Sequence, residues 1–181
     1  MRFAKKKGDI IVRACRLGSG TKLERELLAS GKLFLRSDGK YEVFSQEAKE
    51  GQGEIACPGD YVKIDTDGYP YPNERSFFEQ YHYQIREDGF RQKSRPVATW
   101  QIGDPSCEAI AFLHQTGRLE IHEEDDAQYF KAELWGAPLS AAKDAVIVFY
   151  SIERDELGTI LDVDFNFVAR SEFERTYEWC E

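Results

Sequence analysis

The sequence predicts an α+β protein made of two tandem copies of a small unit, each with the element order β-α-β-β-β-β-α and mostly antiparallel sheets packed on helices. The first observation behind this prediction is a repeat. Ser-Gly-Lys-Leu at 30–33 recurs as Thr-Gly-Arg-Leu at 116–119, and Leu27 recurs as Leu113 at the same spacing of 86 residues. The second is an alternation of apolar and polar residues typical of strands, interrupted in both halves by shorter helical patterns. The third is composition, because 41% apolar residues with 12 Phe and 9 Tyr suffice for a packed core.

Further pairs extend the repeat with drifting offsets, as expected where loops accept insertions and packed elements do not. The pairs are Lys40-Tyr41 with Gln128-Tyr129, 60–64 with 144–148, and Phe77-x-x-x-Tyr81 with Phe173-x-x-x-Tyr177. We therefore expect a first α+β repeat at 1–85, a polar linker at 86–94 that contains Gly89, and a degenerate, acidic second repeat at 95–181.

The first copy begins with a β-prone segment at 10–17 and continues into a helix that starts at the capping box Thr21-x-x-Glu24. Gly31 stands where a helix commonly ends in a left-handed residue. A hairpin at 32–36 and 41–46 and a strand at 61–65 follow. The Tyr-Pro-Tyr-Pro segment at 69–72 is extended but cannot donate through its prolines, which predicts an edge strand. A short helix at 74–83, anchored by Phe77 and Tyr81, closes the copy.

The second copy shows the same order of signals. Pro96 favours a strand at 97–102, Asp104-Pro105 supplies an N-cap and a first helical proline, and Gly117 ends the helix. A hairpin is predicted at 118–122 and 128–135, and a strongly apolar strand at 145–151. Apolar and polar residues alternate at 161–167, which predicts a half-buried strand, and a helix is expected at 171–179.

The charge distribution disfavours nucleic acid as the main partner. The net charge is −9 and the surplus is C-terminal, because residues 1–88 hold 15 basic and 15 acidic residues whereas residues 89–181 hold 9 and 18. The basic cluster between Arg2 and Arg16 is interpreted as the solvated face of a first strand. Without a signal peptide or a run of roughly 18 apolar residues, the sequence predicts a cytoplasmic protein with no membrane partner.

The sequence predicts no cofactor and no metal site. Its cysteines show no C-x-x-C spacing, which favours free thiols at Cys15, Cys57, Cys107 and Cys180. The spacing of His82, His114 and His122 does not match helical ligand pairs. Gly-Ser-Gly-Thr-Lys at 18–22 departs from the phosphate-binding pattern and is interpreted as an N-capping turn. The acidic run at 123–126 is interpreted as a solvated hairpin tip, with docking to a basic partner as the alternative.

The strongest local motif is Pro58-Gly59-Asp60-Tyr61-Val62, which follows Cys57. With it, the basic opening at 2–7 and the aromatic closing helix, the first copy resembles a family of small uncharacterised bacterial and phage proteins named after the motif Pro-Gly-Asp-Tyr-Gly. Val62 replaces the final glycine, and the second copy retains only Asp144 of the motif. The resemblance implies no established activity; it implies a bacterial or prophage accessory protein.

Pro-Gly favours a type II turn that delivers Asp60 to the start of a strand, and this structural role is the preferred interpretation. A functional interpretation would place a binding pocket for a ligand or partner near that turn, formed by Asp60, Tyr61, Tyr69, Tyr71, Asn73 and Arg75. We expect a non-enzymatic binding or interaction module whose partner is another protein or a small ligand. The alternative is a small enzyme or ligand-binding protein that uses this first-copy pocket.

Overall fold

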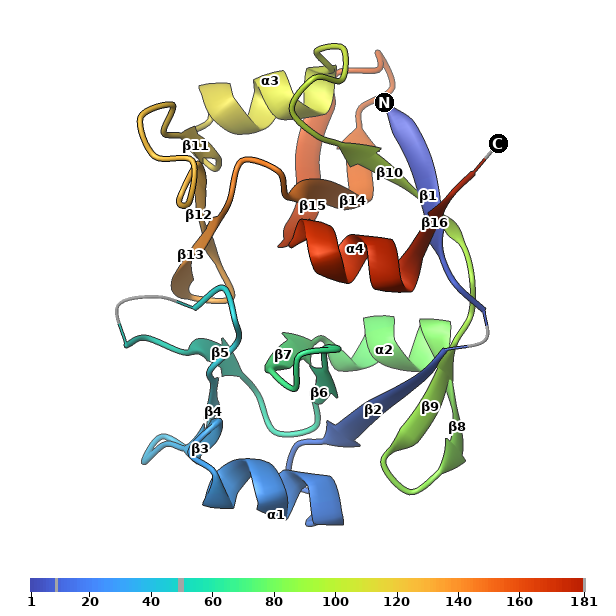
Figure 1. Cartoon of the computed structure of the whole chain (residues 1–181), viewed down its shortest axis with the longest axis vertical. Helices are drawn as coiled ribbons and strands as arrows, with labels where there is room; N and C mark the ends of the chain where they lie inside the picture. Colours follow the sequence, from blue (N-terminus) through green and yellow to red (C-terminus); the bar gives the residue numbers. More distant parts are fainter. Residues whose placement is uncertain (9, 49–50, 181) are drawn as a thin grey trace. The chain divides into compact units, whose positions relative to one another are not determined.

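The computed structural model describes residues 1–8, 10–48 and 51–180, and has an α+β architecture of four short helices and mostly antiparallel sheets (Figure 1). The chain forms two compact units. The N-unit comprises Lys7–Ser94 and Leu134–Pro138, and the C-unit comprises Met1–Lys6, Arg95–Glu133 and Leu139–Glu181. No described helix has the length and apolar character that crossing a membrane requires.

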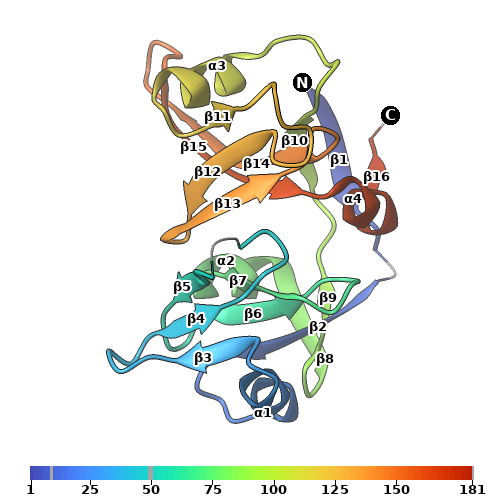
Figure 2. The same cartoon turned by 60° about the vertical axis from the view of Figure 1, so that its left-hand side comes forward.

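The N-unit is built on a five-stranded antiparallel sheet. Its strands are, in spatial order, β7 (Pro70–Asn73), β6 (Tyr61–Ile64), β2 (Ile11–Arg16), β9 (Gly89–Gln92) and β8 (His82–Arg86). A second sheet contains β3 (Leu33–Leu35), β4 (Tyr41–Val43) and β5 (Glu54–Ala56). The helices are α1 (Lys22–Ala29) and α2 (Arg75–Tyr81), and α1 runs beside β3 (Figure 2).

Alternation along β2 gives the N-unit two apolar clusters. Cys15 packs with Leu23 and Leu27 of α1 and with the small sheet, whereas Ala14 packs with Phe78 of α2 and with Phe90. This follows from the two-residue period of a strand, which sends neighbouring side chains to opposite faces. The β2 strand is therefore the centre of the unit.

The C-unit has a sheet of the same size. Its strands are, in spatial order, β15 (Ile160–Val168), β14 (Val146–Arg154), β10 (Pro96–Trp100), β1 (Arg2–Lys6) and β16 (Tyr177–Trp179). A second sheet contains β11 (Glu120–Ile121), β12 (Phe130–Leu134) and β13 (Ala137–Ala141), and the helices are α3 (Glu108–Gln115) and α4 (Arg170–Thr176). Val146 and Val148 pack with Phe173 of α4 in its core.

Four of the five strands in each large sheet occupy corresponding places, because β7-β6-β2 matches β15-β14-β10 and the edge strand β8 matches β16, with β2 and β10 in the middle. One position is filled differently. In the N-unit β9 lies between β2 and β8, whereas in the C-unit β1 lies between β10 and β16. The strand beside β16 therefore comes from the chain before the N-unit, whereas the strand beside β8 is the next one in sequence.

Several predicted elements have different boundaries in the structure. The expected linker at 86–94 contains β9, and residues 1–6 pair with β10 and β16 of the C-unit rather than opening the first copy. The helices expected at 74–83 and 171–179 end at Tyr81 and Thr176, and the chain continues as strands β8 and β16. The extra strands β5 and β13 were not predicted.

Turn signals gave the most accurate predictions of element ends. Gly31 and Gly117 have φ of 72° and 68° directly after the C-caps of α1 and α3, as predicted. In both helices the second residue after the C-cap donates its N–H five residues back, from Lys32 to Leu27 and from Arg118 to Leu113. This is the Schellman arrangement that a left-handed glycine makes possible. The segment at 69–72 was correctly predicted as an edge strand, since β7 borders its sheet.

The helix starts differ from the prediction. The Thr21 side chain makes no capping bond, and Leu23 N–H of α1 instead donates to Asp88 Oδ2 at 2.9 Å. Asp88 lies 65 residues further along the chain, so no local motif could reveal this cap. The helix α3 begins at Glu108, after the N-cap Cys107, while Asp104 accepts a hydrogen bond from Gln101 N–H.

The second helices show that the expected correspondence of aromatic pairs was wrong by one residue. Phe78 stacks on His82 with ring centroids 4.0 Å apart, and Phe173 stacks on Tyr177 at 4.8 Å. Each pair joins a buried helical phenylalanine to the C-cap residue that directly follows the helix. Phe77 is only half-buried, so Phe78 is the structural counterpart of Phe173.

Candidate functional site

The Pro-Gly-Asp-Tyr motif forms the predicted turn at the start of β6. Asp60 N–H donates to the Cys57 carbonyl at 3.1 Å, and Gly59 has a φ of 93°. A positive φ at the third residue is the requirement of a type II turn that glycine meets without strain. Leu17 N–H then donates to the Asp60 carbonyl at 2.8 Å, which joins the turn to the end of β2.

The Asp60 carboxylate makes two hydrogen bonds to the backbone. Oδ2 accepts from Cys57 N–H at 2.9 Å, and Oδ1 accepts from Arg75 N–H at 3.1 Å. Arg75 is the first residue of α2, and the N-cap of that helix makes no side-chain bond of its own. Asp60 therefore closes the turn and caps a helix that begins 15 residues later.

The three tyrosines of the predicted pocket point to different partners. The Tyr61 ring stacks on Phe78 at 4.0 Å, and its hydroxyl donates to Glu79 Oε1 at 3.3 Å. Burial, together with the Glu79 carboxylate, raises the pKa of Tyr61. Tyr69 is 40% exposed and lies 5.0 Å from the Lys32 ammonium. Tyr71 lies 5.7 Å from the Lys63 ammonium, so the phenols do not converge on one point.

The remaining two predicted residues make local contacts. Asn73 Nδ2 donates to the Pro72 carbonyl at 2.8 Å, and Arg75 Nε donates to Glu79 Oε1 at 3.1 Å. The register pairs Asn73 with Tyr61, and Tyr71 with Lys63, so these side chains share the α2 face of the sheet. Tyr69 lies directly before β7, and its ring contacts the Lys32 ammonium instead of this group of side chains.

A buried polar cluster on that α2 face was not predicted. Lys63 is 3% exposed, and its ammonium lies 3.0 Å from His82 Nε2 and 3.1 Å from Gln92 Oε1. His82 Nδ1 lies 2.9 Å from the Phe78 carbonyl, which can only accept. Nδ1 therefore carries the proton, and Nε2 accepts from Lys63. The three residues come from three strands, so only the charged Lys63 within an apolar strand could have indicated the cluster.

The backbone N–H groups of the loop between β2 and α1 bind the carboxylate of Glu24. Glu24 is 2% exposed and accepts the N–H groups of Gly18 at 2.6 Å and Gly20 at 2.5 Å. Burial, reinforced by Glu24, raises the pKa of the nearby Cys15 thiol to about 12. Because the N–H groups that could hold a phosphate already bind Glu24, this geometry agrees with a structural turn.

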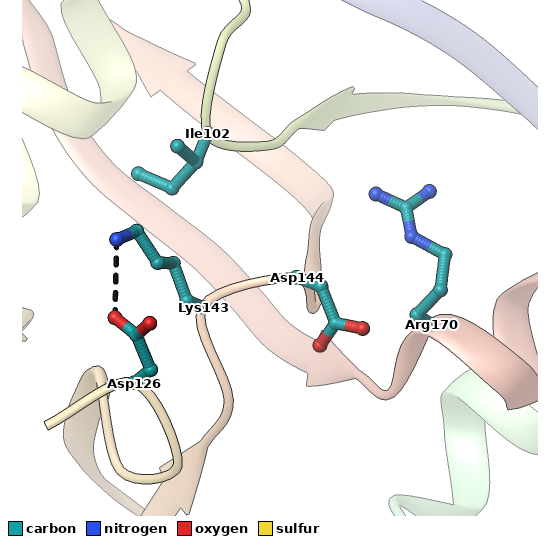
Figure 3. Close-up of a pocket in the computed structure, with 5 residues that line it drawn as sticks. All are labelled: Ile102, Asp126, Lys143, Asp144 and Arg170. Carbon is teal, nitrogen blue, oxygen red and sulfur yellow. Dashed lines mark hydrogen bonds and ion pairs between the residues drawn. The ribbon is translucent and has the colours of Figure 1, made fainter.

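A pocket of about 450 Å³ lies in the C-unit and is lined by Ile102, Asp126, Lys143, Asp144 and Arg170 (Figure 3). Lys143 Nζ contacts Asp126 Oδ1 at 3.0 Å, and the Asp126 hydrogen bond and charge raise the pKa of Lys143. Arg170 donates to Gln101 Oε1 at 2.8 Å. Within the described residues, no group of three His, Cys, Asp or Glu side chains could hold a metal ion.

The pocket occupies the same position in the C-unit as the Pro-Gly-Asp-Tyr turn in the N-unit. Matching turns after the central strands equate Arg16 with Gln101, since Ser19 N–H donates to Arg16 and Asp104 N–H donates to Gln101. The register places Tyr61 opposite Arg16. In the C-unit Trp100 lies opposite Ile147, and continuing this register by one residue matches Gln101 with Val146.

Ala145 is therefore the counterpart of Asp60. Its N–H donates to the Ala142 carbonyl at 3.0 Å, as the Asp60 N–H does to Cys57. Asp144 stands in the place of Gly59, so the expected match of Asp60 with Asp144 was wrong by one residue. Ala145 has no carboxylate to make the two backbone hydrogen bonds that Asp60 makes in the N-unit.

Comparisons with protein-family models, curated proteins and solved structures found no match to this chain.

Proposed function

We propose that this protein is a non-enzymatic binding module, an accessory protein of a bacterium or prophage that belongs to the Pro-Gly-Asp-Tyr-Gly motif family. In this proposal it is built from two diverged copies of one unit and binds an acidic protein partner through an exposed sheet face of the N-unit. The observation that carries the proposal is that exposed apolar side chains and arginines lie together on strands β8, β9 and β2, a surface that we call the β8–β9–β2 face.

Matching architecture supports the duplication. Four of the five strands in each large sheet occupy corresponding places, α1 and α3 end in the same Schellman arrangement, and α2 and α4 bury equivalent aromatic pairs. Local propensity alone does not produce the same non-local strand order twice. The one-residue shifts described above then reflect insertions in the connecting loops.

The β8–β9–β2 face presents apolar side chains to solvent in a row. Tyr83 pairs with Arg91, and Arg91 pairs with Ile11, so these three side chains lie side by side on one face. Ile85 follows Tyr83 by two residues, at the irregular pairing between Gln84 and Arg86, and its side chain is also exposed. Tyr83 is 48% exposed, Ile85 42% and Ile11 41%. Adjacent exposed apolar residues of this kind are common at protein interaction sites.

Arginines surround these apolar residues. Arg13 is on β2 two residues after Ile11, and it contacts Glu26 at 3.2 Å. The Arg86 side chain lies over Gly89, so close that a Cβ added to this glycine would meet Arg86 Cγ at 2.6 Å. Among the described residues, Arg86 and Arg91 form no ion pair. The face therefore carries positive charge available to carboxylates.

The composition of the face favours a protein over a nucleic acid. Proteins that bind single-stranded nucleic acid stack bases on several aromatic side chains, whereas this face offers one tyrosine beside two isoleucines. An enzymatic site around Asp60 is less well supported, because both carboxylate oxygens bind backbone N–H groups.

The test uses the full chain and a fluorescein-labelled peptide of alternating glutamate and leucine, followed by fluorescence anisotropy. Arg91→Glu is expected to weaken binding about tenfold, because it places a negative charge opposite the peptide carboxylates. Lys40→Glu is the matched control, since Lys40 is exposed in the β3–β4 turn and causes the same charge change. Equal effects of the two variants, or no binding, would overturn the proposal. Equally tight binding of oligothymidylate would assign the face to nucleic acid instead.

A further inference from the structure

The C-unit pocket holds one acidic and one basic group that do not neutralise each other. Lys143 is paired with Asp126 through its ammonium at 3.0 Å, and through its backbone N–H to the Asp126 carbonyl at 2.9 Å. Arg170 contacts only the neutral Gln101 side chain among the described residues. Within the same described part of the chain, the Asp144 carboxylate makes no hydrogen bond or ion pair.

Figure 3 shows how these groups are placed. Lys143 reaches Asp126 on one side of Asp144, and Arg170 lies on the other side, with its guanidinium directed away from the Asp144 carboxylate. Ile102, which is 38% exposed, adds an apolar wall to the pocket. The lining therefore offers an anion, a cation and an aliphatic surface around one volume.

We propose that this pocket binds a free α-amino acid with an aliphatic side chain. Arg170 would hold its carboxylate, because the planar guanidinium matches a carboxylate with two parallel hydrogen bonds. Asp144 would accept from its ammonium group, and Ile102 would contact its side chain.

The charges of the pocket exclude simpler ligands. A phosphate or other anion would meet Arg170 but would be repelled by the unpaired carboxylate of Asp144. A divalent cation would find two carboxylates, one of them already bound to Lys143. An α-amino acid, whose ammonium and carboxylate groups are attached to the same carbon, offers one group of each charge to Asp144 and Arg170. The volume of about 450 Å³ lies within the range of small-molecule sites and leaves room for the side chain.

The site follows from the loss of the motif in the C-unit. In the N-unit, Asp60 occupies the corresponding position and binds the first N–H of α2. Ala145 replaces it in the C-unit, where the first residue of the equivalent helix is Arg170. The inference goes beyond the proposed function, because it concerns another unit and a small molecule.

Isothermal titration calorimetry of the full chain with L-leucine tests the inference. Binding is expected at millimolar leucine. Two derivatives of leucine should lose this binding, and this comparison requires no change to the protein. N-acetyl-leucine lacks the ammonium that Asp144 would hold, and leucinamide lacks the carboxylate that Arg170 would hold, so neither should bind measurably.

Two conservative variants locate the site. Asp144→Asn and Arg170→Lys should each weaken leucine binding about tenfold, since the first removes the negative charge that would bind the ammonium and the second replaces a bidentate guanidinium with a single ammonium. Glu156→Gln and Arg154→Lys, which change exposed residues near the β14–β15 turn, should leave binding unchanged. Far-UV circular dichroism checks that each variant is folded.

Three results would overturn the inference: no heat with leucine, equal binding of N-acetyl-leucine, or equal effects of pocket and control variants. The ligand series uses only the unaltered chain, so an unstable variant would not prevent a decision. Because the peptide test concerns the N-unit, its failure would leave this result unaffected.

Discussion

Replacing Asp60 with alanine tests whether this residue, the acidic group of the predicted pocket, has a structural role. The change removes the hydrogen bond to Arg75 N–H at the start of α2 and the bond to Cys57 N–H in the turn. Loss of a helix cap costs about 1 kcal/mol. The bond within the half-exposed turn adds about 0.5–1 kcal/mol, because water replaces part of it.

The expected total is a loss of about 1.5–2 kcal/mol in the free energy of unfolding, measured by urea denaturation at pH 7. For a chain of this length that corresponds to a melting temperature lower by about 3–8 °C. Asp60→Asn keeps one carbonyl acceptor and should lose about half as much. Glu87→Gln, at an exposed position of the same unit, should change stability by less than about 0.5 kcal/mol. An alanine variant with unchanged stability but lost peptide binding would refute the structural role.

Three further perturbations test the packing and the buried groups. Burial raises the pKa of Glu54 from 4.5 to about 7, so the folded state binds more protons between these values and its stability falls as the pH rises through them. Glu54→Gln should abolish this fall and stabilise the chain above pH 7 by on the order of 3 kcal/mol, and an unchanged pH dependence in urea titrations would contradict it. Phe78→Ala should cost about 3–5 kcal/mol and Phe77→Ala less than about 2, whereas the reverse ranking in thermal melts would make Phe77 the counterpart of Phe173. Iodoacetamide at pH 8 should modify the exposed Cys57 and spare the native Cys15, whose pKa is about 12, and early labelling of Cys15 in mass spectra would show the burial to be wrong.

Local signals explain which parts of the fold could be predicted. Gly31, Gly117 and the Pro58-Gly59 turn were correct, because a positive φ or a fixed proline φ is a property of the residue itself. The strand at 161–167 was correct because its alternation marks one buried face. Each of these signals is contained in a few consecutive residues.

Features that depend on distant residues could not be predicted in this way. The cap of α1 comes from Asp88, and the buried Lys63 is partnered by side chains from β8 and β9. The one-residue error in the second helix arose because Phe77 and Phe78 are both aromatic, and only packing shows which one is buried. The predicted pocket failed to converge for the same reason, since the directions of its tyrosines depend on register.

The position of β1 determines the order in which the chain can fold during synthesis. This strand leaves the ribosome before the N-unit, yet its partners β10 and β16 are among later segments, and Thr99 Oγ1 donates to the Arg2 carbonyl across 97 residues. The intervening residues 7–94 hold nearly all of the N-unit, which can therefore fold first, as an insertion within the C-unit. Prior folding of the insertion shortens the effective loop between β1 and β10 and so lowers the entropy lost on their pairing. A nascent chain released before Trp179 would leave β1 without one of its two neighbours, with an open strand edge available to other chains.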